Sequence, residues 1–249
     1  MTGAPTSEWL FDLGNSRLKF APVVEGQVGE VRSVAHAGGR LPRGWDAALP
    51  ERFEAAWIAS VAAAPVRDAL RDALAARARH LQHASTLPAC AGVRIAYARP
   101  ERLGVDRFLS LLGAHARSAG RPCLVVGVGT ALTVDLLEGD GRHRGGRIAP
   151  SPTLMREALH ARAAQLPVEG GAHTDFASDT GDALASGCEG AALGLVRDSL
   201  GSARALLGEA PALLVHGGGA APLLPRLADA LHAPALVLEG LLQFRIAAC

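Results

Sequence analysis

The feature that most constrains how this chain folds is a strand–turn–strand pattern near its beginning. The apolar run 9–11 ends at Asp12, Gly14-Asn15 forms a tight turn, and a second apolar run returns over residues 18–24. Short apolar runs on either side of a Gly-Asn turn are typical of an antiparallel β-hairpin. We therefore expect the first elements of the chain to be paired strands.

The same pattern occurs a second time near the middle of the chain. The apolar run 123–126 leads into the glycine turn 127–130, and residues 131–137 read as the returning strand. Segments with helical periodicity follow each copy. The repetition predicts an α/β protein of two similar domains, residues 1–118 and 119–249, with the boundary near Ala119-Gly120-Arg121-Pro122.

Helical periodicity is clearest in two segments of the first half. Over residues 64–80, every fourth position from Val66 is apolar, which predicts one buried face formed by Val66, Leu70 and Leu74. Over residues 107–118, the apolar positions that we expect to face inward are Phe108, Leu111 and Leu112. Further helices are predicted over 153–165, 180–206 and 222–231, and further strands over 28–35, 55–60, 144–149, 213–215 and 235–238.

Composition excludes several classes of function. The 25 basic and 24 acidic residues give a formal net charge of +1, so nothing favours binding to nucleic acid or to a membrane surface. Neither a signal-peptide pattern nor a transmembrane run is evident, which indicates a cytoplasmic protein. The four cysteines lack CxxC spacing, so we expect free thiols and no zinc site at Cys90, Cys123, Cys188 and Cys249.

The first turn has the residues of a phosphate-binding loop. Backbone N–H groups of such a turn can hold phosphate oxygens, and Lys19 adds positive charge. Asp12, at the end of the first strand, can hold Mg²⁺ directly or through water. A plain β-hairpin is the alternative, because Gly-Asn turns are common.

A second candidate for chemistry is the segment Gly104-Val105-Asp106-Arg107, which follows a loop containing Pro100. A carboxylate beside a guanidinium supplies a base and a cation, the pair needed to transfer a phosphoryl group to an alcohol. Asp106 could instead simply cap the helix that begins there.

Taken together, these segments resemble the type III pantothenate kinases, members of the acetate kinase/sugar kinase/Hsp70/actin superfamily. The resemblance covers almost the whole chain, and its strength lies in the order and spacing of the motifs, since each alone is weak. The matching segments are 12–16 with Lys19, 104–107, 129–135, 145–150, 179–180 with 186–187, 217–220 and 236–241.

The resemblance implies two actin-like (ribonuclease H-like) domains with a nucleotide cleft between them. It also implies ATP-dependent phosphorylation of pantothenate with Mg²⁺, the first step of coenzyme A biosynthesis, by a homodimer. Asp106 would be the general base. The residues that would bind ATP are Asp12, Leu13, Gly14, Asn15, Ser16, Arg17, Leu18, Lys19 and Thr130, with the glycine cluster 217–219 against adenosine.

The pantothenate site implied by the resemblance contains Tyr97, Gly104, Val105, Asp106 and Arg107, with Thr180 reaching in from the partner subunit. Each has a plainer interpretation. Tyr97 could be a core or strand residue, Arg107 could form a salt bridge to Asp106, and Thr180 could be a helix N-cap. The glycine cluster could be an ordinary turn between a strand and a helix.

One position departs from the family pattern. Members commonly carry an acidic residue two positions before the Gly-Thr-Ala of the second turn, where it helps bind K⁺ or NH₄⁺, and this chain has Gly127 there. A positive side chain could replace the ion, and His216 beside the glycine cluster is interpreted as structural. The alternatives to pantothenate kinase are a same-fold kinase for another small alcohol or acid, and a non-catalytic transcription-accessory protein.

Overall fold

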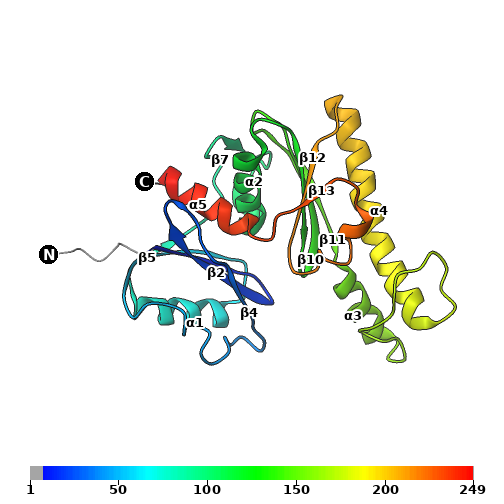
Figure 1. Ribbon diagram of the computed structural model, residues 1–249, viewed down its shortest axis with the longest axis horizontal. Coiled ribbons are helices and arrows are strands. Elements are labelled where there is room, and N and C mark those ends of the chain that lie inside the picture. Colours follow the sequence, from blue (N-terminus) through cyan, green and yellow to red (C-terminus); the bar gives the residue numbers. More distant parts are fainter. Residues whose placement is uncertain (1–7, 249) are drawn as a thin grey trace. The chain divides into compact units, whose positions relative to one another are not determined.

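A computed structural model describes residues 8–248, which form two compact units. The first unit contains the described residues up to Arg117 together with those from Ala235 onward, and the second contains Ser118–Pro234 (Figure 1). The expected boundary at residue 118 assigned the end of the chain to the second domain, whereas here the last helix packs within the first unit.

The sheet of the first unit has the order β3-β2-β1-β5-β6, and β4 also pairs with β2. The hairpin expected from the first turn is present, because β1 pairs antiparallel with β2, while its other neighbour, β5, runs parallel to it. The strands are β1 (Glu8–Leu13), β2 (Arg17–Val24), β3 (Gln27–Val28), β4 (Arg32–Ala35), β5 (Phe53–Ser60) and β6 (Ala78–His83).

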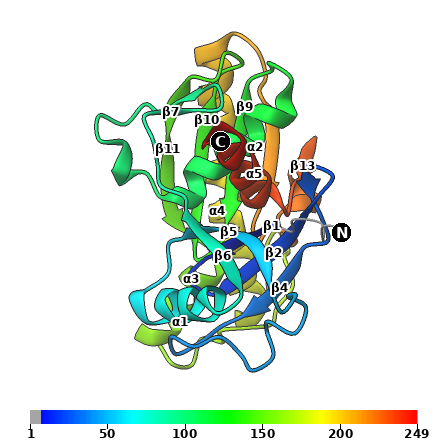
Figure 2. The same ribbon diagram turned by 90° about the vertical axis from the view of Figure 1, so that its left-hand side faces the viewer.

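Helix α1 (Ala64–Ala75) covers one face of this sheet (Figure 2). Its buried side chains are Val66, Leu70 and Leu74, which confirms the predicted apolar face. They join a core of aromatic residues from the strands, in which the rings of Phe11 and Phe20 stack with centroids 5.9 Å apart. Burial of these large side chains, at roughly 1.5–3 kcal/mol each, stabilises the sheet that carries the first turn.

Helix α5 (Leu236–Ala248) lies against α2 (Val105–Ser118) in the first unit (Figure 1). A Cβ atom on Gly240 would lie 1.7 Å from the carbonyl oxygen of Leu109, so the two backbones approach more closely than side chains allow. The rings of Phe108 and Phe244 meet edge to face, 6.4 Å apart. Phe108, Leu111 and Leu112 of α2 are buried, as predicted.

The predicted strand over 235–238 is wrong, because these residues begin α5. The run is apolar on every side and its first three helical residues are buried, so period alone does not separate a strand from a buried helix. The rest of the first unit consists of short elements: β7 (Ala89–Cys90), β8 (Val93–Arg94) and the 3₁₀ turn η1 (Pro100–Arg102).

The second unit is built on a sheet of order β11-β10-β9-β12-β13. Its apolar core lies between the sheet and the long helix α4, with Val126, Val134 and Val215 from three neighbouring strands packed against Ala192 and Val196. The elements are β9 (Cys123–Val128), β10 (Ala131–Leu137), β11 (His143–Pro150), α3 (Pro152–Arg162), α4 (Thr180–Leu207), β12 (Ala212–His216), η2 (Leu224–Arg226) and β13 (Ala230–His232).

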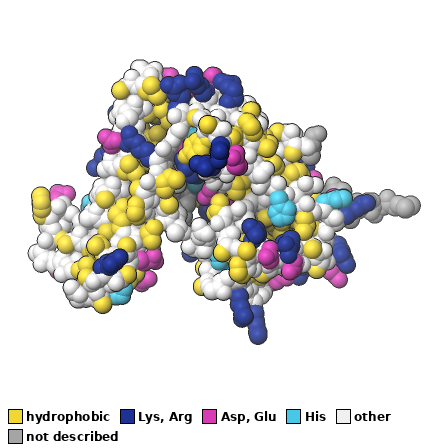
Figure 3. All heavy atoms as spheres, turned by 180° about the vertical axis from the view of Figure 1, so that it is seen from behind, with side chains coloured by type: hydrophobic (Ala, Val, Ile, Leu, Met, Phe, Trp, Pro, Cys, Tyr) yellow, Lys and Arg dark blue, Asp and Glu magenta, His cyan; other side chains and the backbone are white. Residues whose placement is uncertain are grey.

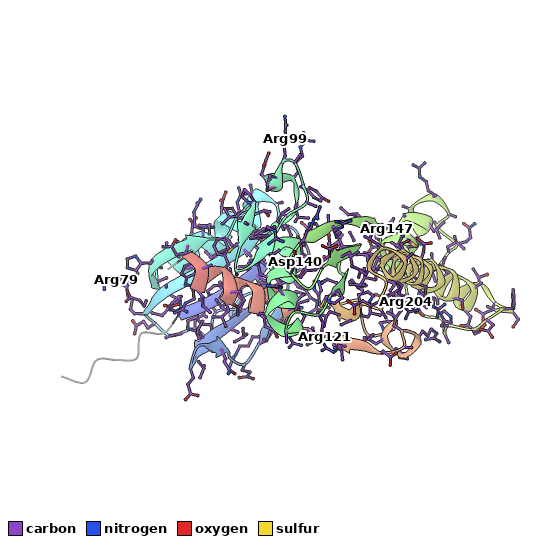
Figure 4. All side chains as sticks on the ribbon, turned by 90° about the horizontal axis from the view of Figure 1, so that it is seen from above. Arg79, Arg99, Arg121, Asp140, Arg147 and Arg204 are labelled. Atoms are coloured by element: carbon purple, nitrogen blue, oxygen red, sulfur yellow. The ribbon has the colours of Figure 1, made fainter. Side chains whose placement is uncertain are left out.

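Arg147 fastens strand β11 to helix α4 (Figure 4). Its guanidinium forms an ion pair with Asp198 and donates hydrogen bonds to the hydroxyls of Ser199 (3.1 Å) and Ser202 (3.3 Å). Helix α4 ends at Gly208, which has the left-handed conformation (φ 74°) usual for a glycine that closes a helix. The prediction of a helix over 180–206 is therefore confirmed.

One predicted helix is absent and another is shorter than predicted. The segment 222–231 contains only the turn η2 and the start of β13, because Pro222 and Pro225 interrupt the backbone hydrogen bonds of a helix. The segment 64–80 is helical only to Ala75 and then enters β6, a strand that pairs parallel with β5.

Among the described residues no helix is both long and apolar enough to span a bilayer. The three described cysteines are free thiols, and Cys249 lies outside the described residues.

Candidate active site

The first turn joins β1 to β2 and is closed by one hydrogen bond within the backbone and one from a side chain. The Gly14 N–H donates to the Arg17 carbonyl (2.9 Å), and His36 Nε2 donates to the Gly14 carbonyl (2.8 Å). Leu13 and Leu18 are buried on either side and fix the hairpin to the core, while the turn residues between them are exposed: Asn15, Ser16 and Arg17. The turn is therefore held rigidly with its tip in solvent.

Asp12 is the polar residue of this hairpin with the most unusual environment. It lies directly across from Lys19 in the strand pairing and is half-buried. The pKa of its carboxyl is raised to about 7, mainly by burial; the charge of Lys19 lowers the pKa, and the nearby Asp106 carboxylate raises it. A desolvated carboxylate of this kind gains strongly from a bound cation, because the cation replaces the lost hydration.

Asp106 lies in the first turn of α2, one residue after the helix begins. Its Oδ1 accepts a hydrogen bond from the Arg107 backbone N–H (2.8 Å). A Cβ atom on Gly104 would lie 2.7 Å from the same oxygen, so only glycine leaves room for this carboxylate position. Asp106 is thus positioned within the helix, and the plain N-cap interpretation does not describe it.

Arg107 and Tyr97 form a pair beside Asp106. The Arg107 side chain is only 6% exposed, its Nη1 donates to the Tyr97 hydroxyl (3.3 Å), and its Cζ lies 5.9 Å from the centre of the tyrosine ring. Tyr97 itself is half-buried and belongs to no strand, so it is not a core residue. The structure therefore brings together four predicted residues: Gly104, Asp106, Arg107 and Tyr97.

The second unit contains the second glycine turn and the glycine cluster. Thr130 is exposed in the turn between β9 and β10, which is closed by a hydrogen bond from Gly129 N to the Ala131 carbonyl (2.9 Å). After β12, Gly219 N donates to the Val128 carbonyl (3.0 Å). Gly217 has φ 98°, and a Cβ there would lie 2.3 Å from that carbonyl oxygen. The cluster therefore packs directly on the end of β9, next to the turn that carries Thr130.

Thr180 is the first residue of α4 and is exposed. The N-cap of this helix is its neighbour Asp179, whose carboxylate accepts hydrogen bonds from Gly181 N (2.8 Å) and Asp182 N (3.1 Å). These bonds lower the pKa of Asp179. The interpretation of Thr180 as a helix N-cap is therefore wrong, and its hydroxyl is not needed to start the helix.

Two contacts at these turns were not expected from the sequence. The His36 side chain, from the segment after β4, donates a hydrogen bond to the Gly14 carbonyl. The ring of His216, on the neighbouring strand, lies above Gly127. No motif marks His36. The contact of His216 could have been found from the strand order, since Gly127 and His216 are at equivalent ends of two parallel strands.

Solved structures of low sequence identity share the fold of this chain. A Baf family transcriptional activator from Campylobacter jejuni has a TM-score of 0.59 at 18% identity, with 93% of this chain and 94% of that chain covered. A 2-dehydro-3-deoxygalactonokinase protein from Sinorhizobium meliloti has a TM-score of 0.58 at 17% identity, with 97% and 95% covered. The expected α/β fold class is confirmed.

Sequence relatives are much closer. The type III pantothenate kinase of Stenotrophomonas maltophilia strain K279a is 55% identical over 240 residues, which cover 96% of this chain and 98% of that protein. The type III pantothenate kinase of Xanthomonas campestris pv. campestris strain B100 is 55% identical over 235 residues, 94% and 96% of the two chains. The family model described as type III pantothenate kinase matches residues 9–201. This chain belongs to the type III pantothenate kinase family.

Proposed function

We propose that this chain phosphorylates the primary hydroxyl of pantothenate with ATP and Mg²⁺, giving 4'-phosphopantothenate for coenzyme A biosynthesis. The observation that carries the proposal is the pair of neighbouring carboxylates, Asp12 at the end of β1 and Asp106 at the start of α2, beside a phosphate-type turn. Relatives that share more than half of the sequence are named for this activity.

Asp106 is the group best suited to act as general base. Its carboxylate would accept the hydroxyl proton while the substrate oxygen bonds to the γ-phosphorus and the bond from that phosphorus to the leaving ADP oxygen breaks. Base assistance of this type contributes about 10²–10⁴-fold in rate. Arg107, held by Tyr97, would bind pantothenate or neutralise charge on the transferring group, and Gly104 and Val105 would line the same wall.

The first turn fits the triphosphate and its metal. Asp12 would hold Mg²⁺ directly or through water, because its desolvated carboxylate is of the hard oxygen type that this ion prefers. When bound, Mg²⁺ neutralises charge on the phosphates. The remaining contacts to ATP would come from the turn itself, from Lys19, and from Thr130 at the second turn; the turn residues are Leu13, Gly14, Asn15, Ser16, Arg17 and Leu18.

A homodimer is the proposed assembly, because Thr180 is exposed and the family resemblance gives it to the partner's substrate. Two features support a second copy as the occupant of the surface formed by α3 and α4. An apolar groove of about 690 Å³ runs between these helices, lined by residues that include Leu154, Met155 and Leu184. Phe176, in the segment that leads into α4, is 99% exposed. Hydrophobic side chains are visible on this unit in Figure 3.

In a two-fold dimer, the exposed Phe176 of each copy could pack into the groove of the other, because such an interface pairs the same surface on both copies. Leu159→Glu, at the groove, should give monomers in light scattering, whereas Leu206→Glu, at a somewhat more exposed leucine of α4 outside the groove, should leave dimers. Dimers that persist in Leu159→Glu would contradict this interface.

A coupled assay that detects ADP tests the proposed reaction. Turnover is expected with ATP, Mg²⁺ and pantothenate, and not when pantothenate is replaced by a sugar acid or another small alcohol. Turnover with another acceptor alone would identify a same-fold kinase of different specificity. No turnover with any acceptor would favour an accessory role. The free thiols of the described chain suit a reducing compartment, and the cytoplasm remains the proposed location.

A further inference from the structure

Gly127 lies in the middle of a row of residues that crosses the sheet of the second unit. In the pairing of β9 with β10 its partner is Thr133, and in the pairing of β9 with β12 its partner is His216. Residues paired in this way point their side chains to the same face of a sheet. Because glycine has no side chain, the space above it is open to both neighbours.

Thr133 and His216 fill that space. A Cβ atom placed on Gly127 would lie 2.7 Å from the Thr133 hydroxyl oxygen and 3.0 Å from His216 Nε2. Real Cβ atoms do not approach a neighbour as closely as 2.7 Å, so a side chain at residue 127 would displace at least one of the two. The space that an acidic side chain at residue 127 would occupy is therefore taken up by Thr133 and His216.

The row lies at the edge of the sheet where the second glycine turn and the glycine cluster begin. Gly127 is one residue from the end of β9, and His216 is the last residue of β12, directly before Gly217. In parallel strands such carboxyl ends are where ligands bind. A change in this row therefore acts next to Thr130, the residue of this unit proposed to bind ATP.

The residues present here do not fit a monovalent cation. Potassium and ammonium sites commonly include a carboxylate among several oxygen ligands, whereas the side chains nearest to residue 127 are those of Thr133, with one hydroxyl oxygen, and His216, with an imidazole ring.

We propose that the His216 imidazole takes the place of the monovalent cation and its carboxylate, so that this chain binds nucleotide without K⁺ or NH₄⁺. The inference rests on the proposed kinase function for its meaning. It assigns His216 a positioning role: the ring fills the row beside the second glycine turn and keeps the turn in place.

Calorimetric titration with Mg·ADP tests the proposal without any turnover. The dissociation constant is expected to stay within twofold when 100 mM tetramethylammonium chloride is replaced by 100 mM KCl at the same ionic strength. A tightening of more than twofold in KCl would overturn it. Since no acceptor is present, that result would leave the assignment of pantothenate as substrate untouched.

A pair of variants tests the role of His216 itself. Gly127→Asp alone is expected to lower the Tm, because the new side chain collides with Thr133 and His216. Gly127→Asp combined with His216→Ala opens the space and supplies a carboxylate, so this double variant should regain Tm and acquire tighter Mg·ADP binding in KCl. A double variant that folds and shows no response to K⁺ would mean that His216 does not occupy the place of the ion. The comparison in the unmodified chain remains decisive if the double variant fails to fold.

Discussion

The carboxylate of Asp106 lies close enough to Asp12 to raise its pKa, although the two residues are far apart in the sequence. Burial is the larger cause of the shift, and Lys19 offsets part of it. Two acids in one place whose environments differ can take different roles. In the proposed mechanism, Asp12, the more desolvated of the two, would hold a cation, and Asp106 would accept the proton.

Asp106→Asn should fold, bind Mg·ADP and lose turnover. The amide keeps the shape of the side chain but cannot accept the substrate proton, so we expect kcat to fall by about 10²–10⁴-fold. Steady-state kinetics with pantothenate, together with calorimetry for the nucleotide, would measure both effects. A kcat close to that of the unmodified chain would remove Asp106 from the base role.

The affinity for Mg²⁺ should depend on pH through Asp12. With a pKa of about 7, the carboxyl binds a proton below pH 7, and the metal must displace that proton. Mg²⁺ binding in the presence of ADP should therefore weaken by about tenfold for each pH unit below 7 and reach a plateau above it. The measurement is a Mg²⁺ titration at pH 5.5, 6.5 and 8. A flat profile would show that Asp12 does not contact the metal, directly or through water.

The same shift predicts how stability depends on pH in the absence of nucleotide. The folded-state pKa of Asp12 lies above its unfolded value of 3.8, so the folded protein binds the proton more tightly. The free energy of unfolding should therefore decrease as the pH rises from about 4 to 7, by at most about 4 kcal/mol and by less to the extent that solvent reaches the carboxylate. Asp12→Asn should be more stable than the unmodified chain at pH 8 but not at pH 4, in chemical unfolding followed by circular dichroism.

Gly104→Ala should reduce turnover while leaving the fold intact. The added methyl would lie 2.7 Å from Asp106 Oδ1, so the carboxylate must move, and misplacing a catalytic group by about 1 Å can cost on the order of 10²-fold. Gly104 is half-exposed, so the Tm should change little. Equal effects on kcat in Gly104→Ala and in Gly190→Ala, which has open space around it, would argue that the close approach does not matter.

The parts of the fold that follow from local pattern were predictable. Alternation and glycine turns identified both hairpins, and the fourfold spacing of Val66, Leu70 and Leu74 identified the buried face of α1. The motifs 104–107 and 217–219 were also visible, because glycine, acid and turn residues stand out from an alanine- and leucine-rich background.

What the sequence did not reveal depends on contacts between distant segments. The helix that begins at Leu236 lies backbone to backbone on α2 at Gly113 and Gly240, and neither glycine signals this contact locally. The raised pKa of Asp12 and the filling of the space above Gly127 by His216 likewise require knowledge of which strands and helices are neighbours.

Thr180→Ala should raise the KM for pantothenate more than the KM for ATP. Removing one hydrogen bond to substrate, worth about 0.5–1.5 kcal/mol, corresponds to an increase of roughly two- to tenfold. Asp179→Ala is the matched control: it removes the N-cap of α4, so it should lower the Tm without a selective effect on pantothenate. Equal changes in both KM values for Thr180→Ala would exclude a shared pocket with the partner subunit.

Two glycine-to-alanine changes in helices should have opposite effects on stability. Gly201, in α4, has open space around it, so alanine should stabilise the chain by about 0.5–1 kcal/mol through helix propensity alone. Gly240, in α5, would place its new methyl 1.7 Å from the Leu109 carbonyl oxygen, which forces α5 away from α2. Overpacking of this kind costs roughly 1–3 kcal/mol. Thermal unfolding of both variants checks the signs, and a Tm for Gly240→Ala equal to that of Gly201→Ala would show that α5 does not pack tightly on α2.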